Sequence, residues 1–300
     1  GAACATKWSG LWFLVAFAGL ALAWDLGTRR AAGYRNWQLD WLRHDLKWMP
    51  LWFLGLPFVV YVASWSGWFA TSNGYWRNWA AQNGNHTPVW SVIDSWFQYN
   101  WWMLHFGIGL NAGQSYKSNP LGWMVLARPI SFYWCSGSTK GCAMPKNMVS
   151  EVLAIGTPLL WWGGALALLF CLFWWLNGLI ADLVFHRAAP QRDWRAATAL
   201  VGVAAGWLPW IVFAWHDNRT EFYYYAVAYA PFMIIAITLC LGLVIGPMRA
   251  APGRRAFGAI GAGAYLFVVL LNLAYIYPVL TAGIIQYSAW RSRMWFTRWI

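Results

Sequence analysis

Long, nearly uncharged apolar runs dominate this sequence and restrict what it can fold into. Six of them have about 20 residues, the length that an α-helix needs to cross a hydrocarbon core of roughly 30 Å. They cover residues 6–24, 48–69, 151–176, 196–215, 223–245 and 257–280. Because lipid offers the backbone no hydrogen-bond partner, and these runs show no alternating strand pattern, the sequence predicts an all-α integral membrane protein with about six transmembrane helices.

The composition agrees with a membrane protein and excludes an ordinary soluble domain. Hydrophobic residues make up 60% of the chain and charged residues 10%. The net charge of +12 raises the possibility of nucleic-acid binding, but Lys and Arg form no dense basic run and no nucleic-acid motif occurs. Basic loops that face anionic headgroups explain this charge better, so membrane lipids are expected partners and nucleic acid is not.

The start of the chain does not resemble a signal peptide. Residue 1 is glycine, and residues 1–6 lead directly into an apolar run without a charged n-region or a cleavage site. We therefore expect residues 1–300 to be the C-terminal transmembrane part of a longer protein.

The basic residues predict which loops face the cytoplasm. Loops 25–47, 182–195 and 246–256 are short and hold 11 of the 21 Lys and Arg residues. Since the positive-inside rule applies to short loops, these three are predicted to be cytoplasmic. Loops 70–150 and 216–222 and the C-terminus are then external.

Cysteine positions agree with this topology. Cys135 and Cys142 bracket the turn SGSTKG in the external loop, where an oxidising compartment would permit a disulfide. No zinc-type partner spacing accompanies them. Cys4, Cys171 and Cys240 lie in apolar runs and are expected to be small packing residues.

The 70–150 loop is too long for a simple connection and predicts a functional element. Residues 88–110 have helical periodicity, with an apolar majority and one narrow polar arc, so we expect an interfacial amphipathic helix. The arc holds Ser91, Asp94, Ser95, Gln98 and His105. His105 has two interpretations: a solvated side chain, or a donor to a phosphate or a sugar hydroxyl.

The segment 116–134, YKSNPLGWMVLARPISFYW, is predicted to be rigid and irregular, since Pro120 and Gly122 disfavour a regular helix. It would present Lys117, Trp123 and Arg128 at the interface. Aromatic faces suit sugar rings and cations suit phosphate, with Arg offering a bidentate fork. Alternatively, the two cations only reach lipid headgroups.

The short loop HDNRTEFYYY, residues 216–225, concentrates polar groups at a predicted membrane boundary. Asp217, Arg219 and Glu221 could form a structural ion pair. Alternatively, a carboxylate could hold Arg219 toward a lipid phosphate while the tyrosines from Tyr223 onward line a cleft.

Several other chemistries find no support in the sequence. It has no Gly-rich phosphate loop, no HExxH or paired-cysteine metal motif and no GxSxG elbow. The predicted spans also lack a mid-membrane Asp, Glu, Lys or Arg, which coupled transporters usually need.

Three stretches together resemble the bacterial, especially actinobacterial, polyprenyl-phosphate-mannose protein O-mannosyltransferases. They are ATKWSGLWFL at 5–14, MLHF with YKSNPLGWMVLARPISFYW at 103–134, and NRTEFYYYAVAYAPF at 218–232. The resemblance implies a C-type glycosyltransferase (GT-C) helical bundle. It also implies transfer of mannose from polyprenyl phosphate mannose to Ser or Thr hydroxyls of secreted or translocating proteins, possible contact with the Sec translocon, and a plasma-membrane enzyme whose active face is extracytoplasmic.

The same resemblance assigns site residues. It implies donor-phosphate contacts from Lys7, Arg128 and Arg219. It implies a substrate groove that includes His105, Lys117, Ser118, Pro120, Trp123, Glu221 and Tyr223. The chain departs from the family pattern at His105-Phe106, which stand in reversed order, and at Leu121, where relatives commonly have Trp.

The acidic pair that acts as the family's catalytic base belongs to an earlier external loop and has no counterpart in this chain. The resemblance thus predicts that residues 1–300 alone are inactive, and it implies no firm cofactor or metal. Two alternatives remain: a C-type transferase that moves a polyprenyl-phosphate sugar to a glycolipid, and a membrane transporter.

Overall fold

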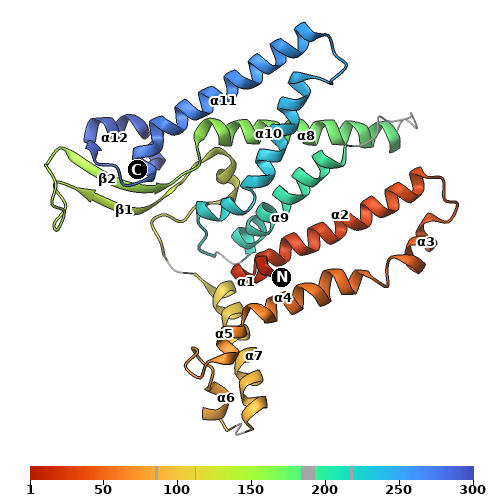
Figure 1. The fold of residues 1–300 in the computed structure, drawn as a ribbon. Coiled ribbons are helices and arrows are strands. Elements are labelled where there is room, and N and C mark those ends of the chain that lie inside the picture. The colour runs from red at the N-terminus through yellow and green to blue at the C-terminus, as the bar shows by residue number, and fades with distance from the viewer. Residues whose placement is uncertain (85–86, 112, 184–192, 217–218) are drawn as a thin grey trace. The chain divides into compact units, whose positions relative to one another are not determined.

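Helices form most of both units into which the chain folds (Figure 1). The computed structural model describes residues 1–84, 87–111, 113–183, 193–216 and 219–300. Unit 1 comprises Gly1–Ala112 and Asp217–Arg219, and unit 2 comprises Gly113–His216 and Thr220–Ile300.

Unit 1 is entirely helical in its described part. Its elements are α1 (Ala2–Thr6), α2 (Gly10–Ala31), α3 (Trp37–His44), a π-helical turn η1 (Leu51–Gly55), α4 (Leu56–Ser64), α5 (Ser66–Ala70), α6 (Trp79–Gln82) and α7 (Pro88–Gly109). The π-helical turn has a local cause, since Pro57 lacks the N–H that would bond to the carbonyl of Phe53 in a regular α-helix. The short helix α1 packs against both α2 and α4.

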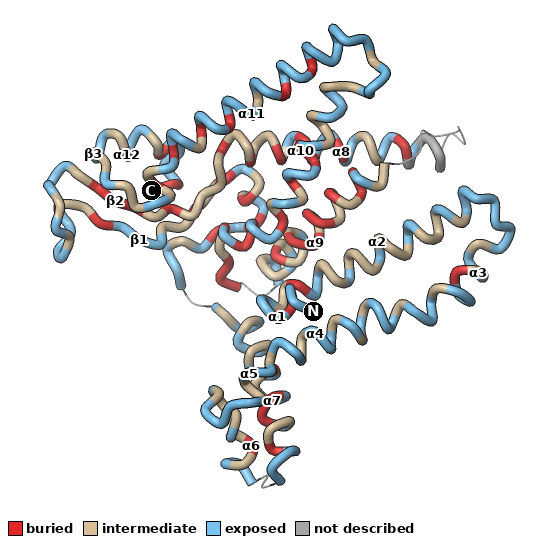
Figure 2. The backbone as a smooth tube through the Cα atoms, in the orientation of Figure 1, coloured by how far each residue is buried: buried red, intermediate tan, exposed pale blue. Residues whose placement is uncertain are grey.

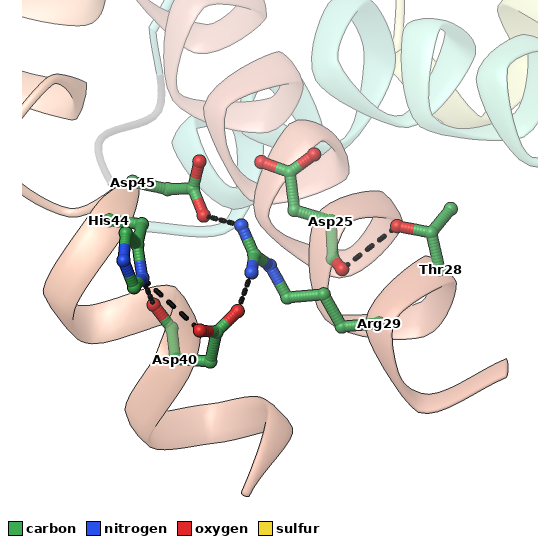
Figure 3. A network of polar contacts seen from close by, with 6 residues as sticks. All are labelled: Asp25, Thr28, Arg29, Asp40, His44 and Asp45. Atoms are coloured by element: carbon green, nitrogen blue, oxygen red, sulfur yellow. Dashed lines mark hydrogen bonds and ion pairs between the residues drawn. The ribbon is translucent and has the colours of Figure 1, made fainter. Parts of the chain in front are cut away.

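An ion-pair cluster joins α2 to α3 in unit 1 (Figure 3). Arg29 near the end of α2 pairs with Asp40 and Asp45, and Nδ1 of His44 lies 3.2 Å from Oδ1 of Asp40. The sequence assigned the basic residues of loop 25–47 only to the cytoplasmic surface. The structure shows that one of them also holds two helices together.

Unit 2 combines a helical bundle with a small sheet. Its elements are the 3₁₀ helix η2 (Pro120–Val125), β1 (Ile130–Ser136), β2 (Met148–Ala154), α8 (Pro158–Leu183), α9 (Trp194–His216), the 3₁₀ helix η3 (Tyr223–Ala228), α10 (Ala230–Ile245), α11 (Pro252–Leu280), β3 (Ile285–Gln286), α12 (Tyr287–Arg293) and the 3₁₀ helix η4 (Thr297–Trp299). Helix α10 packs against α8, α9 and α11. The strands are antiparallel in the order β1-β2-β3.

Burial differs between the helices of the two units (Figure 2). In α2 the sole buried residue is Gly10, and α4 has none. Helix α9 buries eight residues, most of them Ala, Gly and Val. Small residues let helix backbones approach closely, which explains the tight packing of α9 in unit 2.

The mostly helical membrane fold is confirmed, but the count of six spans is not. Within the described residues, helices α2, α8, α9 and α11 contain stretches long and apolar enough to cross a membrane. The apolar helices Leu51–Ser64 and Ala230–Ile245 are shorter. Much of the predicted cytoplasmic loop 182–195 lies outside the described residues.

The structure differs from the predicted spans at two starting points, and it adds a small sheet to the helices. The span predicted at 151–176 begins at Pro158, and Glu151 lies in strand β2. The span predicted at 223–245 begins as the 3₁₀ helix η3, and α10 starts only at Ala230. Segment 116–134, predicted to be irregular, contains η2 and most of β1. The physical reason is long-range pairing: β1 supplies hydrogen bonds to residues whose apolar character alone resembles a helix.

Candidate functional site

Lys7 lies in the tight turn between α1 and α2. The turn is closed by Gly10, where an added Cβ would stand 2.7 Å from the carbonyl carbon of Ala3. The neighbouring Trp8 donates its indole N–H to the hydroxyl of Tyr61 in α4 at 3.2 Å, and Tyr61 in turn donates to Asn100 in α7. The turn that carries Lys7 is therefore held by contacts with α1, α4 and α7.

Arg219 belongs to the same unit and changes the electrostatics of Lys7. Partial burial is the main reason why the pKa of the Lys7 ammonium falls from its usual 10.5 to about 8, and the positive charge of Arg219 lowers it further. The Arg219 side chain is itself buried. Two cations held near each other favour an anion such as phosphate beside them, because the anion relieves their repulsion.

An apolar cavity lies next to this cationic turn within unit 1. It has a volume of about 500 Å³ and lies between α1 and α2 on one side and the π-helical turn and α4 on the other. Its lining includes Cys4, Trp8, Leu11, Phe58 and Tyr61. Trp8 of this lining follows Lys7 directly in the chain, and a cation near an apolar cavity matches the two halves of a lipid phosphate.

Arg128, predicted to contact phosphate, is engaged by the backbone of unit 2 instead. Its Nη1 donates to the main-chain oxygens of Arg298 at 2.9 Å and Ile300 at 3.1 Å, and its Nη2 donates to Ser115 at 3.0 Å. Its guanidinium also lies 5.4 Å from the centre of the Tyr116 ring. These contacts tie the Arg128 guanidinium to other parts of unit 2. They do not support its assignment to the donor phosphate.

Several residues predicted for the groove form one buried cluster in unit 2. Trp123 donates its indole N–H to Ser118 Oγ at 2.9 Å, and the main-chain N–H of Ser118 donates to the carbonyl of Glu221 at 2.9 Å. The carbonyl of Pro120 accepts from the indole of Trp207 at 2.8 Å. All these predicted residues are buried, so they shape the surrounding surface more than they can touch a substrate.

Tyr223 is also buried in unit 2. Its hydroxyl accepts a hydrogen bond from the main-chain N–H of Gly156 at 3.1 Å. Burial, reinforced by Tyr229, raises the pKa of Tyr223 well above its usual value. The phenol therefore stays protonated and cannot serve as a base near neutral pH.

The remaining predicted residues are exposed and lie apart in the chain. Lys117 precedes the buried cluster of unit 2. His105 lies on α7 of unit 1, where its ring centre is 4.2 Å from that of Trp101 and its Nδ1 is 3.0 Å from the Trp101 carbonyl. Helix α7 occupies most of the range 88–110 for which the sequence predicted a helix, and its interfacial position stays a prediction.

Sequence reasoning missed two contacts that hold the last residues of unit 2. Trp290 donates its indole N–H to Oε2 of Glu151 at 2.6 Å, and Trp299 donates to the carbonyl of Leu126 at 2.7 Å. The density of Trp and Arg in residues 290–300 was the available signal. Among the described residues, no group of three His, Cys, Asp or Glu side chains is arranged to hold a metal ion.

Cys135 and Cys142 form a disulfide in unit 2, with their Cα atoms 5.8 Å apart. It closes the connection that follows β1, where Ser136 and Thr139 also share a hydrogen bond of 2.8 Å between their hydroxyls. Within the described residues, Cys4, Cys171 and Cys240 are free thiols.

Comparison with known proteins identifies relatives over the whole chain. Proteins named polyprenol-phosphate-mannose--protein mannosyltransferase match all of it, at 34% identity in Mycobacterium tuberculosis and 31% in Mycolicibacterium smegmatis. A third, from Corynebacterium glutamicum, is 28% identical. The chain covers 55 or 56% of these proteins, so it spans about half the length of the curated relatives it matches. Their names favour neither a glycolipid-modifying transferase nor a transporter.

The fold also matches a solved structure. The yeast protein O-mannosyltransferase Pmt1-Pmt2 complex bound to the sugar donor aligns with a TM-score of 0.55 and 17% identity. The alignment covers 69% of this chain and 27% of the yeast chain. At this identity the likeness establishes the shared GT-C fold.

A family profile decides the assignment. The profile described as the C-terminal four TMM region of protein-O-mannosyltransferase matches residues 92–299. That range holds the apolar helices α8, α9, α10 and α11. With this match, and a relative that is 34% identical over the whole of this chain, the chain belongs to the protein-O-mannosyltransferase family.

Proposed function

We propose that this chain forms the donor-binding part of a membrane enzyme that transfers mannose from polyprenyl phosphate mannose to Ser or Thr hydroxyls of proteins. The observation that carries the proposal is a pair of cations in unit 1, in which Lys7 lies in the turn beside an apolar cavity of about 500 Å³ and its electrostatics are influenced by Arg219. Such an arrangement suits a ligand with an anionic head and a prenyl tail. The names of the actinobacterial relatives supply the sugar and the protein acceptor.

In this reaction the bond from mannose C1 to the phosphate oxygen breaks, and a bond from C1 to the acceptor oxygen forms. A base takes the hydroxyl proton, and the electron pair leaves with polyprenyl phosphate. Lys7 and Arg219 would stabilise the charge on the leaving phosphate, which is where charge develops in the transition state. We place the base outside residues 1–300, in a part of the enzyme that precedes them.

We further propose that the enzyme lies in the plasma membrane with its active face extracytoplasmic, where it can meet polypeptides at the Sec translocon. The predicted positive-inside topology supports this orientation. In that orientation the disulfide between Cys135 and Cys142 would lie in an oxidising compartment, consistent with its formation.

A binding experiment tests the donor site. The chain is placed in nanodiscs, and the affinity for a polyprenyl phosphate is measured for wild type, Lys7→Met and the matched control Lys47→Met. Lys47 is an exposed lysine of the same unit. We expect Lys7→Met to weaken binding about tenfold or more, as loss of a charge-assisted hydrogen bond would, and the control to bind as wild type does. Equal affinities in all three would overturn the proposed donor site.

A transfer assay tests whether the catalytic base lies outside residues 1–300. Residues 1–300 alone should transfer no mannose from polyprenyl phosphate mannose to a Thr-rich peptide, whereas a longer protein that includes the preceding part should do so. Transfer by residues 1–300 alone would show that the base lies within them. If the longer protein transferred mannose to a glycolipid and not to the peptide, the proposal of a protein acceptor would be wrong.

A further inference from the structure

Unit 1 contains a second recess, separate from the cavity beside Lys7. It lies between α6 and α7 and has a volume of about 530 Å³. Its lining includes Trp79 from α6, Asn83 directly after this helix, and Asp94, Gln98 and Trp101 from α7. The proposed transfer reaction uses none of these residues.

Buried hydrogen bonds fix the floor of this recess. The main-chain N–H of Ala80 donates to Ser95 Oγ at 3.0 Å, and the Ser95 hydroxyl donates to the carbonyl of Ser91 at 2.7 Å. Ala80 and Ser95 are both buried. Ser95 thus ties the short helix α6 to α7, so that the two walls of the recess keep a fixed spacing.

The α7 wall has helical order. Asp94, Gln98, Trp101 and His105 follow one another at spacings of four, three and four residues, which places them along one face of the helix. Trp101 is 58% exposed, so its indole is available to a ligand in the recess. His105 lies against Trp101 at one end of this face.

The charge of the recess selects the class of ligand. Among the described residues that line it there is one carboxylate and no Lys or Arg, which disfavours a phosphate or an anionic headgroup. The carboxylate and the two side-chain amides offer several hydrogen-bond acceptors and donors. Such planar groups can bond to two adjacent hydroxyls of a sugar. Indole faces beside them suit the CH face of a sugar ring.

We propose that this recess between α6 and α7 binds a neutral hexose, held by Asp94, Gln98 and Asn83 and stacked on Trp101. That the hexose is a mannose already attached to the acceptor protein rests on the proposed function. Bound there, a mannosylated acceptor would stay with the enzyme for modification of further hydroxyls.

Ligand binding tests the proposal without transfer. Saturation-transfer NMR on the protein in nanodiscs would compare methyl α-mannoside, an O-mannosylated Thr-rich peptide and the same peptide without sugar. Wild type should bind the first two, and Trp101→Ala and Gln98→Ala should bind at least tenfold more weakly. The control Phe106→Ala should bind as wild type, since Phe106 is an exposed aromatic of the same helix that does not line the recess.

Three results would overturn the proposal. In the first, the bare peptide binds as tightly as the mannosylated one, which makes the recess a peptide site. In the second, Trp101→Ala binds as wild type does. In the third, brominated lipids quench the fluorescence of Trp101, measured as the difference between wild type and Trp101→Phe. Such quenching would place this indole in the bilayer.

The transfer assay separates this proposal from the proposed function. Trp101→Ala should keep the initial rate of mannosylation on a bare peptide and lose any preference for a peptide that already carries mannose. If the longer wild-type protein transfers no mannose at all, the proposed function fails, while the binding measurements still decide whether the recess holds a sugar.

Discussion

Arg128 and Ile300 are joined by a hydrogen bond of 3.1 Å between Nη1 of the guanidinium and the main-chain oxygen. The same guanidinium also bonds to the carbonyls of Arg298 and Ser115. Nearby, the buried indole of Trp299 donates to the carbonyl of Leu126. The turn after η2 therefore holds residues 298–300 in place, which gives Arg128 a structural role.

Replacement of Arg128 should release these last residues. We expect Arg128→Ala to lower the free energy of unfolding by about 1.5–3 kcal/mol, the usual contribution of hydrogen bonds to a charged group, and to speed proteolytic digestion near residues 298–300. Arg128→Lys should be intermediate, because an ammonium cannot reproduce the planar fork. Unchanged digestion together with lost donor binding would instead restore Arg128 to the phosphate site.

Glu151 should make unit 2 less stable as the pH rises. Burial raises the pKa of its carboxyl above the usual 4.5, although hydrogen bonds from Trp290 and Ser131 oppose this. The folded protein then binds a proton more tightly than the unfolded chain does. Stability is fully present below the unfolded pKa and declines as the pH rises through the folded pKa.

Two variants of Glu151 separate charge from hydrogen bonding. Glu151→Gln keeps an acceptor for Trp290 and removes the charge. Between pH 4 and pH 8 the thermal midpoint of this variant should therefore change less than the midpoint of the wild-type protein does. Glu151→Leu leaves the buried indole N–H without an acceptor and should cost about 1–3 kcal/mol at all these pH values. A wild-type midpoint that does not change over this range would contradict the buried, proton-binding carboxyl.

Lys7 should make donor binding depend on pH. Its pKa of about 8 means that Lys7 is charged in the free site below that pH and loses its charge as the pH rises through it, which leaves Arg219 as the remaining cation. The affinity for polyprenyl phosphate should therefore fall above about pH 8. The affinity of Lys7→Arg should stay constant up to about pH 9.5, because a guanidinium stays protonated. An identical pH profile in Lys7→Arg would assign the titration to another group.

Loss of the disulfide between Cys135 and Cys142 should destabilise the β1–β2 connection. For such a short closed loop the expected cost is about 2 kcal/mol. Cys135→Ala and the double variant with Cys142→Ala should lose the same amount, because either change removes the same bond. Mass spectrometry should find two more alkylated thiols in reduced than in unreduced wild type.

Gly202 should be required for the close approach of α9 and α10. A Cβ added there would stand 2.2 Å from a carbon of the Phe232 ring, whereas one added at Gly242 of α10 would meet no atom within 4 Å. We expect Gly202→Ala to cost about 1–3 kcal/mol through overpacking, and Gly242→Ala to be neutral or slightly stabilising. Equal thermal midpoints for the two variants would contradict this packing.

Some of these features could be predicted because they depend on neighbours in the sequence. The length and polarity of an apolar run decide whether it can cross a membrane, and helical spacing decides which of its side chains share a face. For this reason the helix predicted at 88–110 corresponds to α7, and its polar arc contains Asp94 and Gln98, two of the residues that line the recess beside α6. The family assignment was confirmed because its motifs are contiguous stretches.

Other features depended on partners far away in the chain. Glu151 resembles the start of a membrane helix until β1 pairs with it and Trp290, 139 residues later, donates to its carboxylate. Arg128 resembles a phosphate ligand until residues 170 and 172 positions away occupy its fork. The sequence by itself determined that this is a helical membrane protein of its family. Only the tertiary structure decided which charged groups are used in folding and which remain for a ligand. The reason is that a donor bonds to an acceptor close to it in space, and that acceptor can be far away in the sequence.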